Sequence, residues 1–201
     1  MTRHLVIFAK APVLGRAKRR LAQEIGAPAA ARFYQRTLAR TIASCGRDPR
    51  WKTWLWITPD GETGHPAWKA AGGRLAMVGQ GTGDLGVRMA RPFKNLPPGP
   101  VVLIGSDIPT VTADIIVAAF GVLGAHDLVF GPAADGGFWL IGAKRVRPWP
   151  RDLFKGVRWS TAHALADTRA NIDRCSSVGL VNTLEDIDDA ESYGRWKEAS
   201  A

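Results

Sequence analysis

Short apolar segments alternate along the chain with segments of helical spacing, and this alternation limits the possible fold more than any other feature. The clearest apolar segment is 101–105, which contains no polar side chain. Such short continuous runs are typical of strands buried on both faces of a sheet. We therefore expect an α/β fold with a mostly parallel mixed sheet and helices on both faces. The expected strands are 5–9, 53–58, 74–78, 101–105, 128–130, 138–141 and 178–181, and the expected helices are 28–45, 85–93, 112–123, 160–172 and 189–197.

Length and composition are typical of a globular protein, and we expect it to be cytoplasmic. The 201 residues predict a single domain spanning 1–201, and 46% of them are hydrophobic against 22% charged. No apolar run approaches the roughly 20 residues that cross a bilayer, so we expect no membrane partner. The run 5–9 is too short for a signal peptide. Cys45 and Cys175 are expected to be reduced thiols.

The net charge of +9 is concentrated near the N-terminus, where residues 1–50 hold 11 Lys and Arg but only Glu24 and Asp48 as acids. This excess favours an anionic partner, either the phosphates of a nucleotide or a nucleic acid. A solvated basic surface is the alternative. Arg32, Arg36 and Arg40 are spaced four apart, so they share one helix face, which we expect to be solvated. No nucleic-acid recognition motif is present, and we expect no nucleic-acid partner.

A basic loop follows the first expected strand. It contains Lys10, Gly15, Arg16 and Lys18. Several cations together with backbone N–H donors suit a polyphosphate. The loop has neither the Walker A spacing nor G-x-G-x-x-G. An ordinary basic surface loop explains the same residues equally well.

Aspartates stand at two positions that favour a divalent metal. Asp107 directly follows the most apolar strand, at the sheet edge where ligands of parallel sheets bind. A carboxylate there suits Mg²⁺ or Mn²⁺, although it could instead cap the following turn. Asp186 and Asp188 lie two residues apart in an extended stretch, which also fits metal binding. Their alternative role is to interact with a helix dipole.

Three further motifs give weaker signals. Asp135, Gly136 and Gly137 have the composition of a tight turn between strands, and the glycines also permit close approach to a ligand. The segment 80–89 opens with Gln80 and a glycine-rich stretch through Asp84 before a helix, whose N-terminus could hold an anion or a base edge. The segment 158–161 contains Ser160 and Thr161, either of which could be a helix N-cap.

Taken in order, these motifs resemble one bacterial family, DUF2064. The shared patterns are F-A-K-A-P-x-x-G-x-x-K-x-R-L, a Gln followed by G-D-L-G-x-R-M, G-S-D-x-P, G-P-x-x-D-G-G-x-x-L-I-G, W-S-T and a late D-x-D. The family is glycosyltransferase-like, and some members are linked to arsenosugar biosynthesis. Its fold is similar to that of molybdenum cofactor guanylyltransferases and 2-phospholactate guanylyltransferases. The chain departs from the family pattern at Leu14, Arg19, Asp189 and Ser192.

The resemblance implies a GT-A-like nucleotide-diphospho-sugar transferase fold and a set of functional residues. It implies that Lys18 binds phosphate, that Asp107 binds a metal, that Asp135, Gly136 and Gly137 form a substrate loop, and that Asp188 is one of the late acidic residues.

The expected activity is a metal-dependent transfer from a nucleotide donor to a small acceptor, with glycosyl transfer from a nucleotide-sugar preferred. The alternatives are nucleotidyl transfer from an NTP with release of pyrophosphate and, from another class, a nucleic-acid-binding protein. Asp107 and Asp188 are the expected ligands of Mg²⁺ or Mn²⁺, and Asp107 and Asp135 are the expected catalytic residues. The expected substrate-binding residues are Lys10, Arg16, Lys18, Gln80, Asp84, Gly136, Gly137, Ser160 and Thr161.

Overall fold

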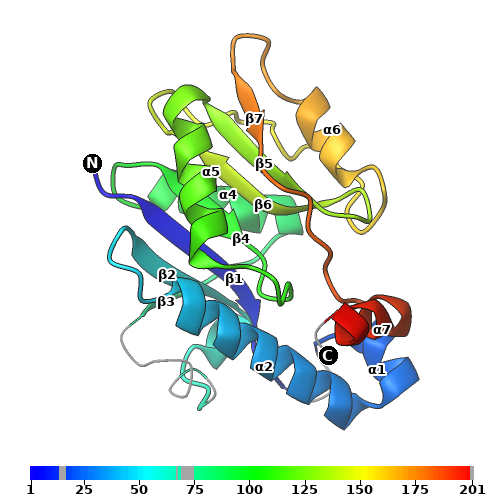
Figure 1. The fold of residues 1–201 in the computed structure, drawn as a ribbon. Helices are drawn as coiled ribbons and strands as arrows, with labels where there is room; N and C mark the ends of the chain where they lie inside the picture. Colours follow the sequence, from blue (N-terminus) through cyan, green and yellow to red (C-terminus); the bar gives the residue numbers. More distant parts are fainter. Residues whose placement is uncertain (14–16, 67, 69–74, 200–201) are drawn as a thin grey trace.

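The fold is a three-layer α/β structure in a computed structural model that describes all residues except 14–16, 67, 69–74 and 200–201 (Figure 1). The described residues form a seven-stranded sheet in the order β3-β2-β1-β4-β6-β5-β7. Its strands are β1 His4–Lys10, β2 Lys52–Thr58, β3 Ala76–Gly79, β4 Val101–Ile104, β5 Leu128–Pro132, β6 Phe138–Ala143 and β7 Val178–Leu180.

The sheet is mixed but mostly parallel. Strand β1 pairs in parallel with both β2 and β4, and the β2–β3 and β5–β7 pairs are also parallel. Strand β6 runs antiparallel to β4 and β5. All four residues of β4 are buried, as expected for the most apolar run of the sequence. The predicted fold class is confirmed.

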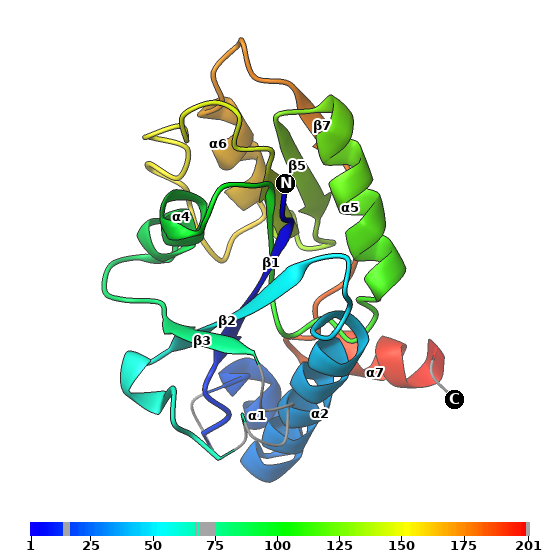
Figure 2. The ribbon, with the colours of Figure 1, turned by 90° about the vertical axis from the view of Figure 1, so that its left-hand side faces the viewer.

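Helices cover both faces of the sheet (Figure 2). They are α1 Arg19–Ile25, α2 Ala27–Cys45, α4 Leu85–Asn95, α5 Ala113–Ala125, α6 Ala164–Ala170 and α7 Ala190–Ala199, with a short 3₁₀ turn η1 at Asp60–Glu62. Helices α2 and α5 pack on one face through residues such as Leu38 and Phe120. On the other face, α4 contributes Met89 and Phe93 to a second apolar cluster. These two layers leave the carboxyl ends of β1 and β4 open to the loops that follow them.

Two predicted elements have other boundaries in the structure, and one helix was not predicted. The helix expected at 160–172 begins only at Ala164, because Thr161 makes a turn: its hydroxyl donates to the Arg158 carbonyl and accepts from the His163 N–H. Helix α1 was not predicted, since it is short and Leu21 is its buried residue. The third strand was expected at 74–78. It spans Ala76–Gly79, and Arg74 lies outside the described residues.

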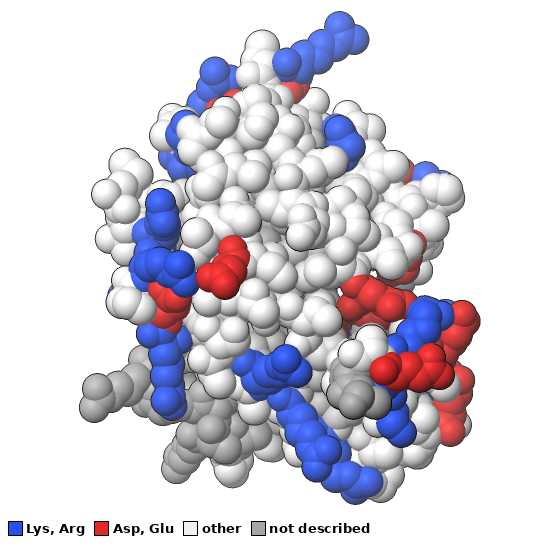
Figure 3. Space-filling view, viewed as in Figure 1, with Lys and Arg blue, Asp and Glu red and all other residues white. Residues whose placement is uncertain are grey.

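The surface of α2 carries the predicted arginine face. Arg32, Arg36 and Arg40 are exposed, and basic side chains line this helix in Figure 3. Both cysteines are free thiols, as expected, with Cys45 buried and Cys175 exposed. Among the helices that the structure describes, none is long and apolar enough to span a membrane.

Candidate functional site

A cleft of about 650 Å³ opens at the carboxyl ends of β1 and β4. Its walls come from these strand ends, the first turn of α4, the β5–β6 turn and segments 159–164 and 186–188. The cleft brings together most of the residues singled out in the sequence: Lys10, Lys18, Gln80, Asp107, Asp135, Gly137, Ser160, Thr161 and Asp188. Asp84 and Gly136 do not line it. Arg16 lies outside the described residues.

Three carboxylates converge in this cleft. One oxygen each of Asp107, Asp186 and Asp188 lies within 4.8 Å of the others. Asp107 is placed by the end of β4, and the other two by an extended stretch in which Ile187 between them is only 2% exposed. Successive side chains of an extended chain point to opposite sides. Burial of Ile187 against Leu21 and Phe33 therefore turns both aspartates the other way, toward the cleft.

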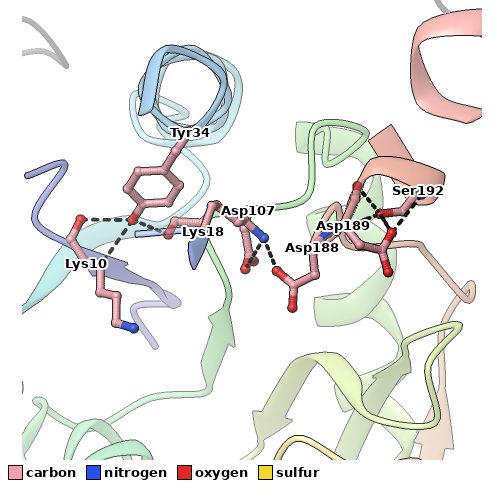
Figure 4. Close-up of polar contacts among 8 residues, drawn as sticks. Lys10, Lys18, Tyr34, Asp107, Asp188, Asp189 and Ser192 are labelled. Atoms are coloured by element: carbon pink, nitrogen blue, oxygen red, sulfur yellow. Dashed lines mark hydrogen bonds and ion pairs between the residues drawn. The ribbon is translucent and has the colours of Figure 1, made fainter. Parts of the chain in front are cut away.

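Asp188 is held in place by the start of α7. Asp189 and Ser192 cap this helix: the Asp189 carboxylate accepts from the Ser192 N–H at 2.9 Å, and the Ser192 hydroxyl accepts from the Asp189 N–H at 3.2 Å (Figure 4). The same hydroxyl accepts from the Asp188 N–H at 3.2 Å. Asp189 and Ser192, two of the four departures from the family pattern, thus form a reciprocal cap that fixes the backbone of Asp188.

Lys18 lies between two of the three carboxylates (Figure 4). Its ammonium donates to Asp107 at 3.0 Å and to Asp188 at 2.5 Å, and its side chain is only 4% exposed. Burial alone would lower the pKa of Lys18, but the two carboxylates outweigh this effect and raise the pKa above its ordinary value. Lys18 therefore remains a cation at neutral pH.

The cluster is still rich in negative charge. Burial, and then the charges of Asp188, Asp107 and Asp135, raise the pKa of Asp186 to about 6. The single positive charge of Lys18 therefore does not neutralise the negative charge of the surrounding carboxylates. Hard oxygen ligands at this spacing suit Mg²⁺ or Mn²⁺, so the donor set fits a divalent cation of this class.

Tyr34 connects the ends of β1 and β4 beside this cluster. Its hydroxyl accepts from the Lys10 N–H and donates to the Lys10 carbonyl, both at 2.9 Å, and lies 3.0 Å from the Ser106 hydroxyl (Figure 4). Burial raises the pKa of Tyr34 to about 12, so it stays protonated. Tyr34 was not among the site residues expected from the sequence. The available signal was a tyrosine on the apolar face of a helix, since a buried tyrosine hydroxyl needs a polar partner.

The Gln80 side chain is buried, and both its amide nitrogen and its amide oxygen form hydrogen bonds. Its amide nitrogen donates to the carbonyls of Ala9 and Trp56 at 3.2 and 3.0 Å. Its amide oxygen accepts from the Arg88 guanidinium at 2.9 Å. Gln80 therefore has no amide N–H left for a ligand, whereas Arg88 lines the cleft. Arg88 is part of the G-D-L-G-x-R-M motif but was not among the site residues expected from the sequence.

The remaining predicted residues have separate structural roles. Asp84 is the N-cap of α4, where its carboxylate accepts from the Val87 N–H at 2.8 Å. Gly136 has φ 85°, and a Cβ there would lie 2.3 Å from the Ala162 carbonyl oxygen, so this position requires glycine for close backbone packing. Asp135 is exposed, and one of its oxygens accepts from the Gly137 N–H at 2.8 Å.

The architecture and the acidic cleft define an α/β protein of the GT-A-like, nucleotide-diphospho-sugar transferase fold. Residues 41–161 match the family DUF2064, described as an uncharacterized protein conserved in bacteria, and this covers more than half of the chain. The chain belongs to this family. None of the curated proteins matches it.

Solved structures share the fold over nearly the whole chain. A proposed nucleotide-diphospho-sugar transferase from Desulfovibrio desulfuricans G20 is 26% identical, with a TM-score of 0.91 over 100% of this chain and 88% of that one. The 4-diphosphocytidyl-2C-methyl-D-erythritol synthase of Anaerococcus prevotii is 11% identical, with a TM-score of 0.64 over 100% and 96%. Glucosyl-3-phosphoglycerate synthase of Mycobacterium tuberculosis, solved with Mg²⁺ and UDP, is 14% identical, with a TM-score of 0.55 over 92% and 69%. The last two likenesses concern the fold alone.

Proposed function

We propose that this protein is a metal-dependent transferase that moves a glycosyl group from a nucleotide-sugar to a small acceptor. The observation that carries the proposal is the convergence of Asp107, Asp186 and Asp188 beside Lys18 at the open edge of the sheet. Cationic and metal-binding groups side by side suit the diphosphate of a nucleotide donor. The likeness to a proposed nucleotide-diphospho-sugar transferase supports the same class.

Asp107 and Asp188, together with Asp186, would hold Mg²⁺ or Mn²⁺. When bound, the ion would neutralise the charge of the donor diphosphate. Lys18 has three N–H donors, of which two are used by the aspartates, so the third is left for a phosphate oxygen. Lys10 lines the cleft and is exposed, which suits a second contact to phosphate.

Asp135 is the proposed general base. The Gly137 N–H orients one carboxylate oxygen, and Asp135 lines the same cleft as the metal-binding aspartates. In the proposed step, the acceptor oxygen forms a bond to the anomeric carbon while the bond from that carbon to the diphosphate breaks. The nucleoside diphosphate leaves, and the acceptor proton passes to Asp135. Ser160 and Thr161 line this part of the cleft and would contact the acceptor.

Nucleotidyl transfer is the second candidate. Its support is the fold shared with the 4-diphosphocytidyl-2C-methyl-D-erythritol synthase of Anaerococcus prevotii. In this reaction an acceptor oxygen attacks the α-phosphorus of an NTP and pyrophosphate leaves. The same acidic cluster and Lys18 would serve it, because fold alone does not decide function.

A thermal-shift screen tests the proposed function and shows which class of nucleotide donor the protein binds. Nucleotide-sugars and NTPs with each of the common bases are tested with and without Mn²⁺. A ligand present at 100 times its Kd adds about 2.7 kcal/mol to the free energy of unfolding, and each kcal/mol shifts Tm by about 2–4 °C. We expect a nucleotide-sugar to raise Tm by about 5–10 °C only when Mn²⁺ is present. A response confined to NTPs would favour nucleotidyl transfer, and no response to any nucleotide would contradict the proposed function.

Arg88 is expected to contact the nucleotide, and Gln80 to act as its positioning residue. Arg88→Ala should weaken binding of the best ligand from the screen by about tenfold to a hundredfold, because a hydrogen bond from a charged group is worth ~1.5–3 kcal/mol. Gln80→Leu should also weaken binding in the wild-type protein but should add little in the Arg88→Ala background. Isothermal titration of the four proteins measures this coupling. Equal losses in both backgrounds would mean that Gln80 acts only on the structure.

A further inference from the structure

A second groove, of about 420 Å³, lies between α2 and α7. One wall is formed by Arg32, Arg36 and Arg40, and the aromatic side chains lining it are Phe33, Tyr193 and Trp196. Among the described residues, none lines both this groove and the cleft that contains the acidic cluster. The groove is therefore separate from the proposed transferase site.

The three arginines of this groove have no acidic partner within the part of the chain that the structure describes. Some other exposed arginines are ion-paired, namely Arg50 with Asp48, Arg158 with Asp167, and Arg195 with Glu185 and Glu191. Others, such as Arg151 and Arg174, are unpaired among the described residues as well, so what distinguishes Arg32, Arg36 and Arg40 is that all three line one groove. Glu191, an acidic residue of α7, is already paired with Arg195. Figure 3 shows the uncompensated basic side chains as a row over α2. The helical spacing of these arginines predicts only a solvated face, but in the fold this face borders a groove.

Aromatic rings give the groove an apolar side. Phe33 is buried and meets Tyr193 and Trp196 edge to face, with ring centroids 5.3 and 5.2 Å apart. Tyr193 and Trp196 are only half-buried. Solvated arginines kept for solubility would need no aromatic surface beside them. Unpaired guanidinium groups next to half-buried rings are instead typical of recognition surfaces.

We propose that this groove binds an extended acidic peptide segment of a partner protein. Four residues of helix advance about 6 Å, so the arginines present positive charge at that interval. In an extended peptide, side chains on one face recur every two residues, at about 6.6 Å. Acidic residues at alternate positions can therefore meet all three arginines, while an apolar side chain of the peptide contacts Tyr193 or Trp196. A DNA duplex would match the charges but would place no apolar group against the rings. A single strand can stack its bases on aromatic rings, so it is the occupant that the test must separate from the peptide.

Fluorescence anisotropy tests the proposal with a fluorescein-labelled hexapeptide that has Glu at alternate positions and one Phe between them. The control peptide has Gln in place of each Glu. The groove variant is Arg32→Gln, Arg36→Gln and Arg40→Gln combined. Its matched control is Arg151→Gln, Arg169→Gln and Arg174→Gln, which changes net charge equally at three exposed arginines outside the groove.

We expect the acidic peptide to bind at low salt and the groove variant to weaken it by about tenfold, given the modest energy of each exposed ion pair. The matched control should stay within about twofold. Circular dichroism should show the same melting for all proteins, because exposed substitutions rarely alter stability. Nucleotide binding should be unaffected by the groove variant, so a failed nucleotide screen would leave this test intact.

Three outcomes would overturn the proposal. One is the absence of peptide binding at millimolar protein. Another is equal weakening by the groove variant and the matched control, which would mean that net charge alone attracts the peptide. The last is binding of a labelled single-stranded or duplex DNA, lost in the groove variant, by a protein that does not bind the peptide. That result would assign the groove to nucleic acid.

Discussion

Replacing Asp107 with asparagine should abolish metal-dependent nucleotide binding and leave the fold intact. Asp107 is one of three converging carboxylates and also accepts a hydrogen bond from Lys18. Loss of a residue that only orients a metal ligand already costs about tenfold to a hundredfold in metal affinity, so loss of a ligand should exceed a hundredfold. The fold should survive, since the side chain belongs to the cleft and not to the core.

Isothermal titration with Mn²⁺ and the best nucleotide from the screen measures this effect. Asp152→Asn is the matched control, because it removes an exposed carboxylate that does not line the cleft. Its affinity should equal that of the wild type. If a folded Asp107→Asn protein bound nucleotide with the same metal dependence, the acidic cluster would not be the metal site.

Most strands and helices could be predicted because buried segments have a recognisable pattern of apolar residues in the sequence. Strand β4 is apolar throughout and is buried at every position. The same reasoning places Asp107 correctly at the open edge of the sheet, because a carboxylate directly after such a strand has no packing role. Whether it binds metal stays a prediction. Helix α6 was expected to begin too early, since Thr161 hydrogen-bonds within a turn that sequence patterns do not distinguish from an N-cap.

Long-range contacts explain what the sequence analysis missed. Asp186 and Asp107 are far apart in the sequence but lie in one cluster at the open edge of the sheet, and only the fold reveals Asp186 as its third member. The pairing of Gln80 with Arg88 depends on two backbone carbonyls of neighbouring strands, those of Ala9 and Trp56. The sequence alone does not show which backbone carbonyls of neighbouring strands become hydrogen-bond partners of Gln80.

Lys18→Met should weaken binding of a nucleoside diphosphate and strengthen binding of Mn²⁺ alone. Two of the ammonium hydrogens are used by Asp107 and Asp188, so a phosphate oxygen would take the third. Loss of one charge-assisted hydrogen bond, worth ~1.5–3 kcal/mol, predicts about tenfold to a hundredfold weaker diphosphate binding, with nucleoside binding unchanged. The cation between the two carboxylates is also removed, so Mn²⁺ no longer competes with it.

The two effects have opposite signs, which separates a phosphate contact from general damage to the site. Without metal, the Lys18→Met protein should melt at a lower temperature, because Asp107 and Asp188 lose their buried cation. Solvent reaches both carboxylates, whose side chains are 35% and 46% exposed, so the loss should be smaller than for a fully buried pair. Addition of Mn²⁺ should raise Tm more in this variant than in the wild type or in Lys155→Met, an exposed control. Equal weakening of nucleoside and nucleoside diphosphate, with no gain in Mn²⁺ response, would show that Lys18 supports the structure and does not contact phosphate.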